Sequence, residues 1–198
     1  MLIFWEERLV FLATPKAGST AIEVALEPLA SLAMQRPPAL KHVDAARYRQ
    51  HLQPFLGEIA AGAFTTVALM REPVEWLRSW YRFERRDADD SPEQGFEDFV
   101  RRYLAAPGAV TQGICTQSAF LGGAKPLVDR IFRYEDIDIF TQFLDDRLGC
   151  EVILPRINVP PAADVSLAAG TEAALRRALA ADLALYASLK PDTGHAAG

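Results

Sequence analysis

The sequence has few cysteines, no surplus of positive charge and no long uninterrupted apolar run. The two cysteines, Cys115 and Cys150, are too few for a disulfide scaffold and lack the spacing of a metal site. Acidic residues outnumber basic residues by 26 to 21, which argues against a general nucleic-acid-binding protein, because such proteins usually carry a basic surplus. Glu6, Glu7 and Arg8 interrupt the apolar N-terminus, so no signal peptide or membrane span is expected. We therefore expect a cytoplasmic protein that binds no nucleic acid.

Length and the alternation of strands with helices predict a single α/β domain. A chain of 198 residues that is 50% hydrophobic can bury one full core, so the domain covers 1–198, with 191–198 as a frayed tail. Strands that alternate with helices are typical of βαβ units, and hence of a mainly parallel sheet with helices on both faces. Apolar patterns predict strands at 1–5, 9–13, 65–70, 129–134 and 152–154, and helices that begin after 18 and 73 and cover about 44–56, 96–104, 116–121, 139–148 and 171–189.

The segment VFLATPKAGSTAIEVAL, at residues 10–26, has the pattern of a strand, a tight turn and a helix. The main-chain N–H groups of residues 17–20 are expected at the start of that helix, where they lack intrahelical acceptors and the helix dipole is positive. Lys16 adds a cation, and Gly18 lets the main chain approach a ligand. The turn is therefore a predicted anion-binding loop. A plain helix start with good N-capping residues is the alternative interpretation.

The order of residues in this turn differs from that of a Walker A loop. There the lysine follows the second glycine, whereas here Lys16 precedes Gly18. Pro-Lys-x-Gly-Ser-Thr after a strand resembles the 5′-phosphosulfate loop of the sulfotransferases, which use 3′-phosphoadenosine 5′-phosphosulfate (PAPS) as donor. The resemblance implies a P-loop-like sulfotransferase fold and no metal ion. It assigns donor binding to Pro15, Lys16, Ala17, Gly18, Ser19 and Thr20.

A second basic site follows the predicted strand at 65–70. Because parallel strands end at one edge of a sheet, we expect Arg71 to lie beside the loop that carries Lys16. A guanidinium there can bind a phosphate with two hydrogen bonds, although a surface ion pair with a nearby glutamate is the alternative. In the sulfotransferases an arginine at a strand end and a serine eight residues later hold the 3′-phosphate of the nucleotide. Arg71 and Ser79 have that spacing, and the resemblance implies the same role for them.

Sulfuryl transfer requires a cation near the leaving phosphate and a base for the proton of the acceptor. We expect Lys16 to supply the cation. Of the three histidines, His42 is the best candidate for the base, since the other two fall in the C-terminal tail and inside a predicted helix. The segment 41–43, Lys-His-Val, is similar to the Gly-His-Val region of the uronyl 2-O-sulfotransferases, whose histidine serves as base. A carboxylate such as Glu84 or Asp87 is the alternative.

The sequence thus predicts a PAPS-dependent sulfotransferase that acts on a small-molecule or carbohydrate hydroxyl, or on an amine. The resemblance covers about 9–136, including the RYED segment at 133–136, and the last helix. A nucleotide kinase or hydrolase is one alternative, but the strand at 65–70 is followed by arginine rather than by a metal-binding aspartate. A non-catalytic nucleotide-binding module is another. The segments 85–92 and 107–119, expected to border the acceptor, carry no pattern that identifies it.

Overall fold

A computed structural model describes residues 1–86, 95–157 and 164–189. The predictions for Asp87 and for the tail at 191–198 therefore lie outside the described residues. The strands are β1 (Leu2–Phe4), β2 (Leu9–Leu12), β3 (Leu32–Ala33), β4 (Thr65–Met70) and β5 (Arg130–Arg133). The helical segments are α1 (Ser19–Leu26), η1 (Glu27–Leu29), α2 (Pro38–Lys41), α3 (Ala45–Arg47), η2 (Tyr48–Leu52), α4 (Gln53–Ala60), α5 (Pro73–Arg86), α6 (Phe96–Ala105), α7 (Pro107–Val110), α8 (Gln117–Phe120), η3 (Tyr134–Asp136), α9 (Ile137–Leu148), α10 (Ala169–Ala178) and α11 (Ala180–Ser188).

The five strands form one sheet in the order β3-β1-β2-β4-β5. Strands β2, β4 and β5 pair in parallel, whereas β1 is antiparallel to both β2 and β3. The α/β class is confirmed, but the expectation of a mainly parallel sheet is wrong, because the sheet is mixed. The cause is the turn between β1 and β2, which spans only residues 5–8 and is too short for the crossover that a parallel pair requires.

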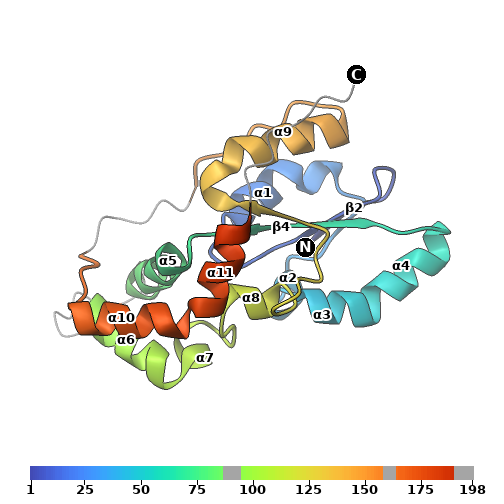
Figure 1. The fold of residues 1–198 in the computed structure, drawn as a ribbon. Helices are drawn as coiled ribbons and strands as arrows, with labels where there is room; N and C mark the ends of the chain where they lie inside the picture. The colour runs from blue at the N-terminus through green and yellow to red at the C-terminus, as the bar shows by residue number, and fades with distance from the viewer. Residues whose placement is uncertain (87–94, 158–163, 190–198) are drawn as a thin grey trace.

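Helices cover both faces of the sheet (Figure 1). Side chains alternate between the faces along each strand, so that neighbours such as Phe11 and Leu12 enter different cores. One core contains buried residues of α1 and α9, and the other contains buried residues of α3, η2, α4 and α8. The central strands β2 and β4 are thus buried on both sides and hold the C-terminal edge of the sheet firmly in place.

A third apolar core lies outside the sheet and joins α5, α6, α10 and α11. Trp76, Phe99 and Leu175 are fully buried in it. This core packs α5, the helix that follows β4, against the C-terminal helices (Figure 1). Among the described residues, no helix has the length and the apolar character needed to cross a bilayer.

Two further predictions about the elements are corrected. Residues 152–154 do not form a strand; Val152 instead donates its N–H to the side chain of Asp145 at 2.7 Å. The last helix is divided at Leu179, whose ψ of 14° breaks the helical geometry between α10 and α11. The other predicted helices are present, and Asp44 caps α3 by accepting the N–H of Arg47 at 2.8 Å.

Candidate functional site

The loop between β2 and α1 requires glycine at one position. Gly18 has a φ of 77°, in the left-handed region that residues with a Cβ rarely adopt. A Cβ added at Gly18 would also lie 2.7 Å from Cε2 of Tyr134, closer than two carbon atoms can approach. Tyr134 follows β5, so the ring of a distant segment packs directly on the loop. Both the conformation and the packing of the loop therefore depend on this residue.

Contacts from α5 anchor the other end of the loop. The indole Nε1 of Trp76 donates to the carbonyl of Pro15 at 3.0 Å. Ala17 and Ser19 are buried, which fixes the loop against the body of the protein. No side chain caps the start of α1, so within the described part of the chain the first N–H groups of this helix are left for an external acceptor. This arrangement suits an anion.

Lys16 faces two aromatic rings of α5. Its Nζ lies 3.9 Å from the ring centroid of Phe83 and 5.3 Å from that of Trp80. Burial, and to a smaller extent the positive charges of Arg86 and Arg71, together lower the pKa of Lys16 to about 8. The ammonium is thus poorly solvated and surrounded by like charge, so a bound anion would relieve both effects.

Arg71 lies at the end of β4 and reaches the loop, as predicted. Its Nη1 donates to the carbonyl of Lys16 at 3.4 Å, and its guanidinium lies 4.9 Å from the ring centroid of Tyr134. The Nε of Arg71 is buried and has no hydrogen-bond acceptor among the described residues. The alternative pairing with Glu75 is present but long, at 4.0 Å, and Glu75 lies closer to Arg78, at 2.6 Å. The structure therefore brings the two basic sites together.

Two other predicted donor-binding residues, Thr20 and Ser79, make no hydrogen bond to Lys16 or Arg71 within the described residues. Thr20 is exposed, and its hydroxyl accepts a hydrogen bond from Nζ of Lys41 at 3.4 Å. Ser79 is half-buried on α5, two turns beyond Arg71. Within the described residues the Ser79 hydroxyl makes no hydrogen bond to Arg71 or to the loop. The serine is thus on the expected helix without being joined to the arginine.

His42 lies beside the end of β2. Its Nδ1 is 2.7 Å from the carbonyl oxygen of Ala13, and because a carbonyl only accepts, Nδ1 carries the proton of this bond. The lone pair of Nε2 is then available in the neutral ring. Burial lowers the pKa of His42, although the bond to Ala13 opposes that shift. Glu84, the alternative base, is held by Arg102 through two hydrogen bonds of 2.9 and 2.8 Å.

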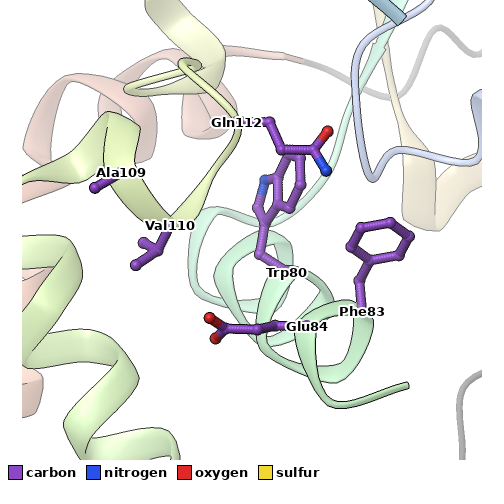
Figure 2. A pocket seen from close by; sticks show the side chains of 6 residues that line it. All are labelled: Trp80, Phe83, Glu84, Ala109, Val110 and Gln112. Atoms are coloured by element: carbon purple, nitrogen blue, oxygen red, sulfur yellow. The ribbon is translucent and has the colours of Figure 1, made fainter. Parts of the chain in front are cut away.

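A cavity of about 190 Å³ adjoins the aromatic rings that face Lys16. Figure 2 shows Trp80 projecting from α5 toward Gln112, in the turn that follows α7, with Phe83 and Glu84 on either side of Trp80. The indole Nε1 of Trp80 is buried without a hydrogen-bond acceptor among the described residues. The remaining lining comes from Ala109, Val110 and Gln112. The cavity is thus lined by apolar and polar groups in similar measure.

Sequence reasoning missed several residues that build this site. Gln117 bonds both main-chain groups of Arg71, and Trp76 and Tyr134 hold the loop. Lys41 pairs with the buried carboxylate of Glu23 at 2.6 Å behind the loop helix. Of these residues, Tyr134 lies in the RYED segment, which the sequence analysis had noted. The roles of the others depend on contacts between segments that are distant in the sequence. No group of three or more potential metal-ligating side chains is found in the described ranges.

Comparison with known proteins found no relative: no family model, no curated protein and no solved structure matches this chain.

Proposed function

We propose that this protein is a sulfotransferase that moves a sulfuryl group from PAPS to an acceptor hydroxyl or amine. The observation that carries the proposal is the hydrogen bond from Arg71 to the carbonyl of Lys16, at 3.4 Å. It joins two cationic residues, 55 positions apart in sequence, at the ends of adjacent parallel strands. Ligands of open α/β sheets bind at this edge. The resemblance of the two motifs to those of the sulfotransferases favours a nucleotide with a 5′-phosphosulfate and a 3′-phosphate.

The residues at this edge fit such a doubly anionic donor. Lys16 and the uncapped start of α1 suit the phosphosulfate, because each presents positive charge or N–H donors to the same loop. The buried Nε of Arg71, which has no acceptor in the described part of the chain, suits a phosphate oxygen, since buried donors are normally satisfied. The glycine at position 18 leaves room for the ring of Tyr134, which packs on the loop. Ser79 is assigned to the 3′-phosphate on its spacing alone.

The bound donor supplies an activated sulfuryl group, whose S–O bond to phosphate breaks as the acceptor oxygen bonds to sulfur. Lys16 neutralises the negative charge that develops on the leaving phosphate. Electrostatic stabilisation of this kind is usually the largest single contribution to catalysis. We assign the proton of the acceptor to Nε2 of His42, whose Nδ1–H remains bonded to Ala13. Glu84, which lines the cavity beside Lys16, is the other candidate base. The buried ring of Trp80 and the partly buried ring of Phe83 limit the access of water to Lys16 and strengthen these charge interactions.

The cavity beside Lys16 is the place we assign to the acceptor. Phe83 both contacts the ammonium and lines the cavity, so a group bound there lies next to the reacting end of the donor loop. A volume of about 190 Å³ is suited to a single six-membered ring, since an apolar cavity of about 150 Å³ accepts benzene. An acceptor that places one ring in this cavity, such as one unit of a carbohydrate, fits the volume.

Calorimetry with adenosine 3′,5′-bisphosphate (PAP), the product of the donor, tests the proposal. We expect PAP to bind without Mg²⁺ and more tightly than adenosine 5′-phosphate (AMP), and labelled sulfate to pass from PAPS to a panel of single-ring acceptors. Mg²⁺-dependent binding of ATP without a preference for PAP would instead establish a kinase or hydrolase. PAP binding without transfer to any acceptor would establish a non-catalytic module.

A further inference from the structure

The main chain of Arg71 is held by a side chain rather than by a neighbouring strand. The β4–β5 ladder ends at Met70, one residue earlier. Beyond it, Oε1 of Gln117 accepts the N–H of Arg71 at 2.9 Å, and Nε2 of Gln117 donates to the carbonyl of Arg71 at 2.8 Å. Gln117 is fully buried, so neither bond competes with water. One amide thus fixes the position from which the guanidinium extends.

A carboxylate of the C-terminal helix in turn holds Gln117. Oδ1 of Asp182 accepts the N–H groups of Gln117 and Ser118 at 2.8 and 3.1 Å, and Oδ2 accepts the hydroxyl of Ser118 at 2.7 Å. Asp182 lies on α11 and is 1% exposed. It therefore acts as a cap for α8 from a helix that is 65 positions away in sequence.

A buried carboxylate is an expensive way to begin a four-residue helix. Removing a charged group from water is costly even when it accepts several hydrogen bonds. The start of α8 already has a local cap, because Thr116 accepts the N–H of Ala119 at 3.1 Å. Asp182 adds a hydrogen bond to the N–H of Gln117, whereas the hydroxyl of Thr116 accepts only the N–H of Ala119.

Helix α11 is also linked to Glu72, the residue after Arg71, through Tyr186 and Glu135. The hydroxyl of Tyr186, one turn after Asp182, donates to Oε2 of Glu135 at 2.7 Å. Oε1 of Glu135 accepts the N–H of Glu72 at 2.9 Å. Helix α11 is therefore linked to the N–H groups of both Arg71 and Glu72 through one intermediate side chain each.

We infer that Asp182 is a positioning residue for Arg71: it holds the first turn of α8 so that Gln117 aims the arginine at the anion site. The inference rests on the proposed function where it assigns the 3′-phosphate to Arg71. Asp182 itself contacts no ligand in this scheme. Its effect reaches Arg71 through two hydrogen bonds, the first from Gln117 N–H to Asp182 and the second from Arg71 N–H to the side chain of Gln117.

Two variants and one matched control test this link. Gln117→Met removes both bonds to Arg71 at similar volume, and Asp182→Asn weakens the cap one step earlier. The control is Asp129→Asn, because Asp129 accepts the N–H and the hydroxyl of Thr66 at 2.7 Å each, at the opposite end of the same strand. Two quantities are measured: hydrogen exchange of the Arg71 amide by NMR, and calorimetric affinity for PAP and AMP.

We expect the Arg71 amide to exchange faster in both test variants and to be unchanged in Asp129→Asn. PAP affinity should fall by roughly five- to tenfold, the effect of losing one or two hydrogen bonds, while AMP affinity changes less than about twofold. If Asp182→Asn does not fold, Ser118→Ala, which removes the hydroxyl that Oδ2 of Asp182 accepts, takes its place by the same criteria.

Unchanged exchange at Arg71 in the test variants would overturn the inference, whether or not nucleotide binds. Equal losses for PAP and AMP would also overturn it, as would a PAP loss of the same size in Asp129→Asn, since these results indicate general destabilisation. Failure of the proposed function has a different signature: the wild-type protein would then show no preference for PAP over AMP, and the exchange data alone would decide the role of Asp182.

Discussion

The guanidinium of Arg71 donates a hydrogen bond to the main-chain carbonyl of Lys16 at 3.4 Å. This contact ties the exit of β4 to the exit of β2, and the Nε of Arg71 has no acceptor among the described residues. The Nε atoms of Arg78, Arg102 and Arg133 share this property, so it is the position of Arg71 beside Lys16 that distinguishes it from them. The incomplete satisfaction of Arg71 is consistent with a ligand oxygen that completes the site.

Replacing Arg71 by alanine tests this interpretation. We expect Arg71→Ala to weaken PAP binding by roughly 1.5 to 3 kcal/mol, the scale of a charge-assisted hydrogen bond, and to affect AMP far less. Calorimetry of both ligands measures the difference. Arg147→Ala, on α9, is the control for a general loss of positive charge. Equal losses for PAP and AMP in Arg71→Ala would assign the arginine a structural role.

Lys16→Ala should sharply reduce sulfuryl transfer and leave the fold intact. Loss of one preorganised charge contact costs on the order of 3 kcal/mol in the transition state, about a hundredfold or more in rate. Single-turnover rates at saturating PAPS measure it, and Lys125→Ala, an exposed lysine outside the site, should transfer at the normal rate. Near-normal turnover of Lys16→Ala would remove the loop from the mechanism.

The depressed pKa of Lys16 predicts an alkaline limit to activity. The ammonium is the useful form, and burial together with Arg86 and Arg71 lowers its pKa to about 8, so its charge is lost as pH rises through that value. We therefore expect kcat/KM, which reports the free enzyme, to fall above about pH 8. Lys16→Arg keeps its charge at alkaline pH and should lose this limb at a lower rate overall. An alkaline limb that persists in Lys16→Arg would assign it to another group.

His42→Ala should lower kcat strongly and barely change the affinity for PAP, since a base contacts the acceptor and not the phosphates. The neutral ring is the active form, and burial lowers the pKa of His42, so the wild-type rate should fall only as pH drops below the ordinary histidine value of 6.5. His51→Ala is the matched control. A His42→Ala enzyme that keeps its rate and its acid limb would exclude the histidine as base.

Gly18→Ala should cost more stability than its conformation alone explains. A residue with a Cβ at positive φ costs about 1–2 kcal/mol, and the collision with Tyr134 adds the overpacking cost of about 1–3 kcal/mol. Gly149→Ala isolates the first contribution, because Gly149 has a φ of 68° and no atom within 4 Å of an added Cβ. Denaturant unfolding of both variants measures the difference. Equal losses would show that Tyr134 yields without cost.

The strand, the turn and the meeting of Lys16 with Arg71 could be predicted from sequence, because apolar periodicity and the rule that parallel strands end together are local or topological facts. The antiparallel pairing of β1 with β2 follows from the short turn at residues 5–8, which is visible in the sequence. The prediction of a mainly parallel sheet relied instead on the alternation of strands and helices. The roles of Gln117 and Asp182 could not be predicted. They depend on hydrogen bonds between segments 46 and 65 positions apart, which no periodicity encodes.

The contact of Lys16 with Phe83 was equally inaccessible from sequence. Dense aromatic spacing on a helix is typical of packing residues, and Trp80 and Tyr81 are 3% and 2% exposed in the third core. Phe83 differs, since it is only partly buried and faces the ammonium. Helical spacing alone does not distinguish a ring at the border of a core from one inside it.

Because two tryptophans of α5 lie next to the donor loop, tryptophan fluorescence reports on the state of that loop. Of the three tryptophans, Trp76 bonds the carbonyl of Pro15 and Trp80 lies 5.3 Å from the Lys16 ammonium, whereas Trp5 packs against Phe64 at the far end of β2. Displacement of the loop or withdrawal of the lysine charge therefore alters the surroundings of two indoles at once. With Trp5 replaced by phenylalanine, intrinsic fluorescence would come only from the two indoles that contact the loop, and occupancy of the loop would be read in real time without a label.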